Sequence, residues 1–140
     1  MPASDGKKYT ERDFKDGTVV LFVYPKDMTP GCTQEACDFR DAYDDFNRMS
    51  VRVFGLSKDS LSSHERFIQK HNLPFPLLSD EKKELLRALH VWKEKKMYGK
   101  TYMGGERSTF VISNGRITHE WRKVRVNHHV TDVLAVLCQQ

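Results

Sequence analysis

The pattern of hydrophobic and polar positions predicts strands and helices that alternate along most of the chain. The longest continuous apolar run, VVLFVY, predicts a buried strand over 18–24, and the alternating VRVFGLS predicts a second strand over 51–57. The segments between and after these strands have polar starts that are typical of helices. We expect helices from about Pro30 to Arg48, from Ser60 with a serine cap, from Glu81, and at the C-terminal end after a cap at Asn127.

Two further strands are expected on either side of Asn114-Gly115. STFVIS covers 108–113 and RITHEWRKV covers 116–124, and an Asn-Gly pair between two such runs is the strongest short signal for a β-hairpin. The order β-α-β-α followed by β-β-α predicts a thioredoxin-like α/β fold with one inserted helix, a three-layer α/β/α sandwich around a mixed sheet. A length of 140 residues fits a single domain over 1–140.

Composition excludes several classes of protein. Hydrophobic residues make up 39% and charged residues 30% of the chain, which is typical of a soluble globular protein. No apolar run approaches the roughly 20 residues that span a bilayer, and the polar N-terminus lacks a signal-peptide core, so we expect a cytoplasmic protein without a membrane segment. The net charge is +4, but the basic residues are scattered among acids. Even the densest basic stretch, 92–100, is interpreted as a solvated face and not as a nucleic-acid site.

The segment TPGCTQEAC places a cysteine at the expected start of a helix. Thr29 is a favoured cap and Pro30 a favoured first helical residue, so Cys32 falls in the first turn. The free N–H groups and the positive end of the helix dipole favour an anion such as a thiolate there. Gly31 would let a polar or anionic ligand approach the backbone closely. The alternative interpretation is that Cys32 is a small buried core residue.

The second cysteine of this segment, Cys37, is too far along the helix to bond with Cys32. Residues five apart in a helix have Cα atoms about 8–9 Å apart, whereas a disulfide needs about 7 Å or less. Either Cys37 is a core residue, or pairing requires the first turns of the helix to unwind. The spacing matches neither the CxxC of dithiol reductases nor a common zinc motif, and the adjacent His128 and His129 are poor partners for one ion. A cation would stabilise a thiolate, and Arg107 is a candidate, although a surface salt bridge explains it equally well.

Several motifs of the chain resemble those of one enzyme family. YPKDMTPGCTQEACDFRD, LPFPLLSD, VWKEKKMYGKTYMGGERSTFVI and WRKV look like the motifs of atypical two-cysteine peroxiredoxins of the bacterioferritin comigratory protein, or peroxiredoxin Q, subfamily, in the same order. The resemblance implies a thiol-specific peroxidase that reduces hydrogen peroxide and organic hydroperoxides in antioxidant defence. It also implies that no metal or organic cofactor is needed, that a thioredoxin-like or glutaredoxin-like protein donates electrons, and that the chain is a monomer.

The resemblance assigns roles to the residues around the cysteine pair. Cys32 matches the peroxidatic cysteine and Cys37 the resolving cysteine, so Cys32 would become a sulfenic acid and then form an intramolecular disulfide. Cys138 matches no catalytic position. It is interpreted either as a core residue or as a stray thiol that links chains on oxidation.

The remaining site residues implied by the resemblance surround the peroxide. Thr29 and Pro30, with Gly31, match the segment that binds and shields it. Arg107 matches the arginine that favours the thiolate and stabilises the transition state, and Glu35 matches the residue that helps to hold this arginine.

One feature of the sequence, its N-terminal segment, departs from the family pattern. Family members begin with a segment like Gly-x-x-Ala-Pro-x-Phe and an early strand, so here the N-terminal segment is expected to be shortened and the opening hairpin incomplete.

Two other functions stay open. One alternative function is a redox sensor in which Cys32 relays oxidation to a partner protein. The other is a thioredoxin-fold protein with a structural cysteine pair and no activity.

Overall fold

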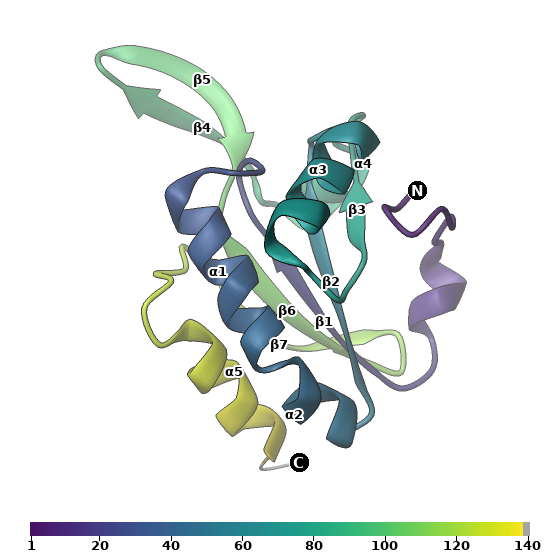
Figure 1. The fold of residues 1–140 in the computed structure, drawn as a ribbon. Coiled ribbons are helices and arrows are strands. Elements are labelled where there is room, and N and C mark those ends of the chain that lie inside the picture. Colours follow the sequence, from purple (N-terminus) through teal and green to yellow (C-terminus); the bar gives the residue numbers. More distant parts are fainter. Residues whose placement is uncertain (139–140) are drawn as a thin grey trace.

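The computed structural model describes residues 1–138 and contains a mixed five-stranded sheet in the order β3-β2-β1-β6-β7 (Figure 1). β1 pairs in parallel with β2, and β2 with β3, whereas β6 is antiparallel to both β1 and β7. Two more strands, β4 and β5, form a separate antiparallel hairpin. The strands are β1 (Thr18–Val23), β2 (Val51–Ser57), β3 (Leu77–Ser79), β4 (Trp92–Met97), β5 (Lys100–Gly105), β6 (Ser108–Ser113) and β7 (Arg116–Trp121).

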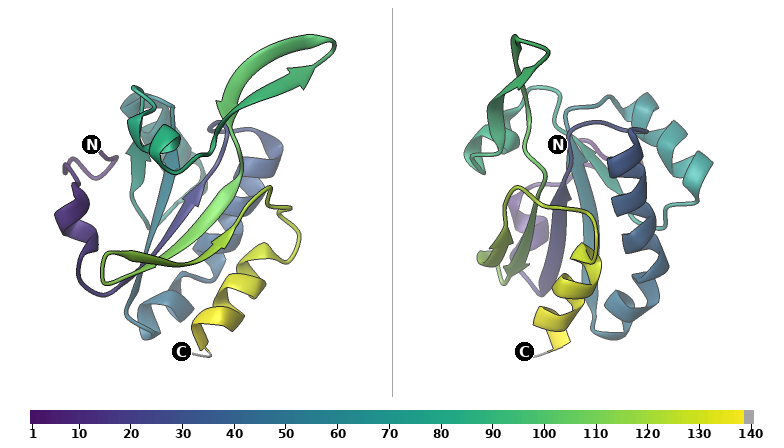
Figure 2. Two further views of the ribbon diagram at one scale, coloured as in Figure 1. Left: turned by 180° about the vertical axis from the view of Figure 1, so that it is seen from behind. Right: turned by 90° about the vertical axis from the view of Figure 1, so that its left-hand side faces the viewer.

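Helices and the N-terminal segment cover both faces of the sheet (Figure 2). Consecutive residues of β1 point to opposite faces, so Phe22 packs with Phe39 under one set of helices and Leu21 packs with Phe54 on the other side. α1, α2, α3 and α5 cover the first face, and α4 with the N-terminal residues covers the second. The thioredoxin-like three-layer fold is therefore confirmed. The helices are α1 (Pro30–Asp41), α2 (Tyr43–Arg48), α3 (Leu61–His71), α4 (Glu84–Ala88), α5 (His129–Cys138) and a 3₁₀ helix, η1 (Glu11–Phe14).

The helix predicted over 30–48 is in fact two helices. α1 and α2 are separated at Ala42, which has a φ of −95° and a ψ of 4°. Alanine is the strongest helix former, so the residue type gives no signal for this break. The serine cap predicted for the next helix is confirmed, because Ser60 accepts a hydrogen bond from Ser63 N at 3.2 Å.

The last two predicted helices begin later than expected. α4 is only five residues long and starts after Lys83, not at Glu81, since Lys83 has a left-handed φ of 60° that a helix cannot include. α5 starts at His129, after His128 with a φ of 62°, so Asn127 is not its cap. In both places a non-glycine residue adopts a left-handed conformation that its residue type does not announce.

The structure contains the predicted hairpin and a second one. Asn114 and Gly115 form the expected turn, with φ values of 50° and 82°, although β7 ends earlier than the predicted 116–124. The basic stretch interpreted as a solvated face belongs to the β4–β5 hairpin, which projects as an arm from the body (Figures 1 and 2). Its turn has the same left-handed pair of angles at Tyr98 and Gly99, with φ values of 52° and 76°. Tyr-Gly is not a usual hairpin signal, which explains why the arm escapes prediction.

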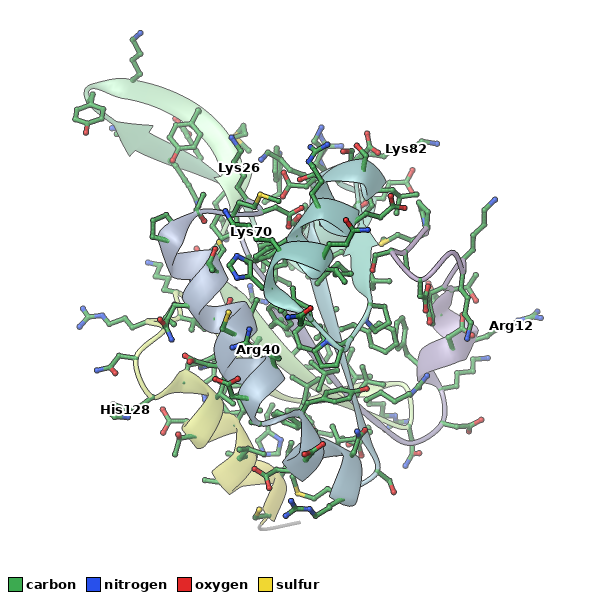
Figure 3. All side chains as sticks on the ribbon, in the orientation of Figure 1. Arg12, Lys26, Arg40, Lys70, Lys82 and His128 are labelled. Carbon is green, nitrogen blue, oxygen red and sulfur yellow. The ribbon has the colours of Figure 1, made fainter. Side chains whose placement is uncertain are left out.

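Basic side chains project at several places along the outline of the molecule in one view. Arg12, Lys82 and His128 point outwards at separate places on the outline of the molecule (Figure 3). Within residues 1–138, no helix has the length and apolar content that crossing a membrane would require.

The N-terminal residues lie along β3, at one edge of the sheet. Ser4 N donates to the carbonyl of Leu77 and Ser79 N donates to the carbonyl of Pro2, each at 3.0 Å. Residues 1–8 thus form a short loop that pairs with β3. This pairing covers an edge that would otherwise expose unpaired backbone groups.

Candidate active site

The first turn of α1 begins where the sequence predicts. Thr29 occupies the cap position with extended backbone angles, Pro30 is the first helical residue, and Cys32 lies in the first turn. The Thr29 hydroxyl donates to the carbonyl of Lys26 at 3.1 Å and makes no capping hydrogen bond to the helix. The Thr29 side chain therefore does not neutralise the first N–H groups of α1, and their partial positive charge lies beside the Cys32 thiol.

Arg107 reaches Cys32 from the link between β5 and β6. Its Nη2 donates to Cys32 Sγ at 3.2 Å, and Cys32 is only 1% exposed. A Cβ at position 31 would lie 3.1 Å from Arg107 Nη2, so the glycine leaves room for this approach. Gly31, which the sequence associates with ligand binding, thus has the guanidinium group as its closest neighbour. The burial expected of a core cysteine is observed, but the sulfur carries a cationic partner that a core cysteine would lack.

Glu35 holds the other arm of the same guanidinium group. Arg107 Nη1 donates to Glu35 Oε1 at 2.9 Å, and the Glu35 side chain is fully buried in α1, one turn beyond Cys32. Burial raises the pKa of Glu35 to about 7, although the charge of Arg107 opposes this shift. Burial lowers the pKa of Arg107, but the charges of Glu35 and Cys32 outweigh it and raise the pKa above its ordinary value. Arg107 is therefore a permanent cation in contact with Cys32. It does form a salt bridge, but with the buried Glu35 and not at the surface as considered from the sequence.

The other two cysteines do not contact Cys32. All three thiols are free. Cys37 is half-buried in the same uninterrupted helix, so the pair has the separated arrangement predicted for an intact α1. Cys138 is exposed at the end of α5, with its Sγ 3.8 Å from Met49 Sδ. The interpretation of Cys138 as a core residue is therefore wrong.

A lysine that the sequence does not single out also lies near the site. Lys95 Nζ donates to the carbonyl of Gly105 at 2.6 Å, two residues before Arg107. Burial, followed by the charge of Arg107, lowers the pKa of Lys95. The sequence does not single out Lys95, because it lies among other lysines. Its hydrogen bond to Gly105 and its partial burial distinguish it from these exposed neighbours only in the structure.

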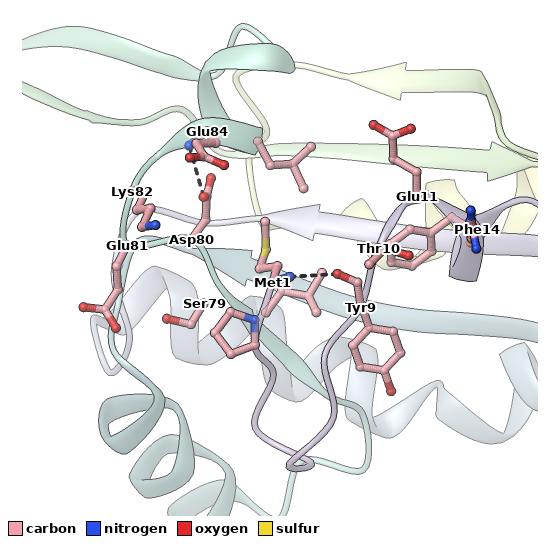
Figure 4. Close-up of a pocket in the computed structure, with 14 residues that line it drawn as sticks. Met1, Tyr9, Thr10, Glu11, Phe14, Ser79, Asp80, Glu81, Lys82 and Glu84 are labelled. Atoms are coloured by element: carbon pink, nitrogen blue, oxygen red, sulfur yellow. Dashed lines mark hydrogen bonds between the residues drawn. The ribbon is translucent and has the colours of Figure 1, made fainter.

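A pocket lies elsewhere on the molecule. It has a volume of about 1220 Å³ and is lined by apolar residues of the N-terminal segment, such as Met1 and Tyr9, and by polar residues at and before the start of α4, such as Glu84 and Asp80 (Figure 4). None of the predicted site residues lines it. Among the described residues, no group of three or more His, Cys, Asp or Glu side chains is placed to hold a metal ion.

Comparison with known protein sequences finds close relatives over nearly the whole chain. The model of the AhpC/TSA family matches residues 1–120. Peroxiredoxin Bcp of Bacillus subtilis (strain 168) is 53% identical over 138 residues, which cover 98% of this chain and 88% of the relative. Peroxiredoxin Bcp of Escherichia coli (strain K12) is 39% identical over 135 residues, which cover 96% of this chain and 86% of the relative.

Solved structures of such proteins share the fold described above. Peroxiredoxin Q of Xanthomonas campestris matches with a TM-score of 0.94 and 43% identity, over 99% of this chain and 89% of that one. The bacterioferritin comigratory protein of the same organism, described in work on its alkyl peroxide reduction activity, matches with a TM-score of 0.93 and 42% identity, over 99% and 88% of the two chains. The chain therefore belongs to the AhpC/TSA family and is a peroxiredoxin of the Bcp, or peroxiredoxin Q, type, an oxidoreductase that reduces peroxides.

Proposed function

We propose that this peroxiredoxin reduces hydrogen peroxide and organic hydroperoxides through Cys32, and that Cys37 resolves the oxidised cysteine. The observation that carries the proposal is the 3.2 Å contact between Arg107 Nη2 and Cys32 Sγ at the start of α1. A guanidinium group that donates to the sulfur favours the thiolate, which is the nucleophilic form of a cysteine.

In the first step, the Cys32 thiolate attacks one oxygen of the peroxide. The S–O bond forms as the O–O bond breaks, so the sulfur is oxidised to a sulfenic acid and the other oxygen leaves as hydroxide or alkoxide. The leaving oxygen takes a proton from solvent and departs as water or an alcohol. Negative charge thus moves from the sulfur to the leaving oxygen. Arg107 and the uncapped N–H groups of α1 flank this path and stabilise the charge along it.

Thr29 and Pro30 form the outer side of the site. Pro30 is exposed and Thr29 is half-buried, so a peroxide that approaches Cys32 passes beside them. The Thr29 hydroxyl donates its proton to the carbonyl of Lys26, which leaves its oxygen lone pairs to accept from the O–H of a peroxide. Pro30 offers no N–H of its own and covers the first turn with an apolar ring.

In the second step, Cys37 attacks the Cys32 sulfenic acid. An S–S bond forms, the S–O bond breaks, and the hydroxyl group leaves as water with the proton of the Cys37 thiol. The separated positions of the two cysteines in α1 require its first turns to unwind before this bond can form. A thioredoxin-like or glutaredoxin-like dithiol then reduces the disulfide by thiol–disulfide exchange and becomes oxidised itself.

Peroxide consumption coupled to thioredoxin, thioredoxin reductase and NADPH tests this proposal. We expect the wild-type chain to turn over hydrogen peroxide and cumene hydroperoxide, and Cys32→Ser to lose both activities. Cys138→Ser is the matched control, because its thiol is exposed and distant from α1 in the chain, and it should keep the wild-type rate. A Cys32→Ser variant with wild-type turnover would overturn the assignment. The same assay with dithiothreitol in place of the thioredoxin system distinguishes two kinds of failure. Turnover with dithiothreitol alone would mean that the proposed reductant is wrong and not the proposed peroxidatic cysteine.

A further inference from the structure

A cluster of buried polar side chains lies beneath the segment that joins β1 to α1, and the mechanism above does not use it. Tyr24, Asp27 and His64 are 1%, 5% and 0% exposed. Asp27 Oδ2 lies 2.7 Å from His64 Nδ1, and Tyr24 donates its hydroxyl to Asp27 Oδ1 at 2.6 Å. Ser63 donates to Asp27 Oδ2 at 2.8 Å. Buried ion pairs contribute little net stability, because desolvation offsets their attraction, so stability alone is a weak reason for this cluster.

The hydrogen bonds fix the orientation of the side chains in the cluster. His64 Nε2 lies 2.9 Å from the carbonyl oxygen of Leu78, where only a protonated nitrogen can donate. Burial and the charge of Asp27 raise the pKa of Tyr24 well above its usual range, so the hydroxyl keeps its proton and donates it to Asp27. Asp27 thus accepts from Tyr24 and Ser63 and lies 2.7 Å from His64 Nδ1, so three side chains fix the position of its carboxyl group.

Asp27 is also anchored through its main chain. Its backbone N–H donates to Asp59 Oδ2 at 2.8 Å, and Ser57 donates its hydroxyl to the same oxygen at 2.7 Å. The anchors of Asp27 therefore come from α3 and from Asp59, which lies between β2 and α3, and β3 in turn holds His64 through the carbonyl of Leu78. Asp27 is thus held in place from several sides at once.

The anchored residue is directly connected to the proposed site. Asp27 is two residues before Thr29 and five before Cys32 in the chain. The carbonyl of Lys26, next to Asp27, accepts the hydrogen bond of the Thr29 hydroxyl. The position of the cap of α1 therefore depends on a loop whose inner side is held by the Asp27–His64 pair.

We propose that Asp27 and His64 are positioning residues, whose buried hydrogen-bonded pair holds the first turn of α1 in the geometry that reacts with peroxide. This inference rests on the proposed roles of Cys32 and Cys37. The pair touches neither the peroxide nor the sulfur. It acts through the loop that places Thr29 and Cys32.

The two chemical steps respond to the pair in opposite directions. Reaction with peroxide needs the folded first turn, so a weaker anchor slows it. Disulfide formation needs the turn to unwind, so a weaker anchor leaves that step unchanged or makes it faster. A residue with a purely structural role would lower stability without producing this split.

The test measures both steps separately in Asp27→Asn and His64→Gln. Quenched-flow mixing with hydrogen peroxide, followed by mass analysis, gives the second-order rate constant of Cys32 oxidation and the first-order rate constant of disulfide formation. We expect the first constant to fall about 10-fold to 100-fold, the scale of rate loss from a misplaced reacting group. The second constant should equal or exceed the wild-type value. His71→Gln is the matched control on the same helix, where the ring packs against Phe67, and both of its constants should match the wild type.

Tyr24→Phe keeps the test decisive if either charged variant fails to fold. It removes the hydroxyl that donates to Asp27 and lies 3.4 Å from His64 Nδ1, and it retains the aromatic ring, so we expect the same split at a few-fold scale. Variants that lose stability in urea but keep both wild-type rate constants would overturn the proposal. So would variants in which both steps slow equally. A wild-type chain that does not oxidise at Cys32 would instead overturn the proposed function, which separates the two failures.

Discussion

Arg107 donates through Nη2 to Cys32 Sγ at 3.2 Å, although 75 residues separate the two in the sequence. The contact is built by two neighbouring strands of one sheet, because β1 leads into α1 and the strand beside it, β6, begins directly after Arg107. The second arm of the guanidinium group is held by Glu35 at 2.9 Å. A single cation thus links the proposed nucleophile to a buried carboxyl group of the same helix.

Replacing this arginine by lysine tests whether its fork matters as well as its charge. Arg107→Lys keeps a cation but cannot contact Cys32 and Glu35 in the same geometry. We expect the rate constant for Cys32 oxidation by hydrogen peroxide to fall about 100-fold, the lower end of what one lost charge-stabilising donor costs. Arg122→Lys is the control, since Arg122 donates to the carbonyls of Leu89 and His90 and should leave the rate unchanged. Equal rates in both variants would show that Arg107 has no part in the reaction.

Gly31 offers a test in which activity and stability move in opposite directions. Alanine favours helices over glycine by up to about 1 kcal/mol, so Gly31→Ala should raise the free energy of unfolding. Its Cβ would lie 3.1 Å from Arg107 Nη2 and push the guanidinium group away from the sulfur. We therefore expect slower Cys32 oxidation in a protein of equal or greater stability, as measured by stopped flow and urea unfolding. A variant that is both stable and fully reactive would contradict this account of the glycine.

Two buried groups should give opposite pH dependences of stability. Burial raises the pKa of Glu35 to about 7, so between about 4.5 and 7 the folded chain binds a proton that the unfolded chain lacks, and stability falls as pH rises. Burial lowers the pKa of His129 to about 4, so between about 4 and 6.5 the unfolded chain binds the extra proton, and stability rises with pH. In the window that both share, the two effects oppose each other.

Single substitutions should separate these effects in urea unfolding followed from pH 4.5 to 6.5. Relative to the wild type, Glu35→Gln should become more stable as pH rises, because only the His129 contribution remains. His129→Gln should become less stable as pH rises, because the Glu35 contribution remains. Parallel pH profiles in all three proteins would show that neither group has the shifted pKa described.

The cysteine pair yields a prediction about oxidised products. After treatment with hydrogen peroxide, Cys138→Ser should form the same intramolecular disulfide as the wild type, and Cys37→Ser should form none while Cys32 is still oxidised once. Non-reducing gels and peptide mass mapping report both results. A monomeric disulfide that survives in Cys37→Ser would point to Cys138 as the resolving thiol.

Local signals in the sequence explain most of the fold around the site. The apolar run of β1, the Thr29-Pro30 helix start and the Asn114-Gly115 turn each have a residue-level cause, and all three occur as predicted. The breaks at Ala42 and Lys83 have no such cause, because neither residue type favours the backbone angles found there.

The parts of the site that escaped prediction depend on long-range contacts. Lys95 differs from the lysines beside it only by its bond to the carbonyl of Gly105. His64 looks like a helix surface residue in SLSSHERF, yet it is fully buried against Asp27, 37 residues earlier. Neither contact follows from periodicity. The Lys95 bond requires the β4–β5 hairpin to form, and the His64 contact requires α3 to pack against the segment after β1.

The most direct test of the central claim is the fate of Cys32 in a chain that carries no other cysteine. We would mix the Cys37→Ser, Cys138→Ser double variant with one equivalent of hydrogen peroxide and trap sulfenic acid with dimedone. The account predicts a stoichiometric dimedone adduct at Cys32. It also predicts that the triple variant that carries Arg107→Met as well forms no adduct within the same brief reaction time. Peroxide consumption without an adduct at Cys32 would contradict it.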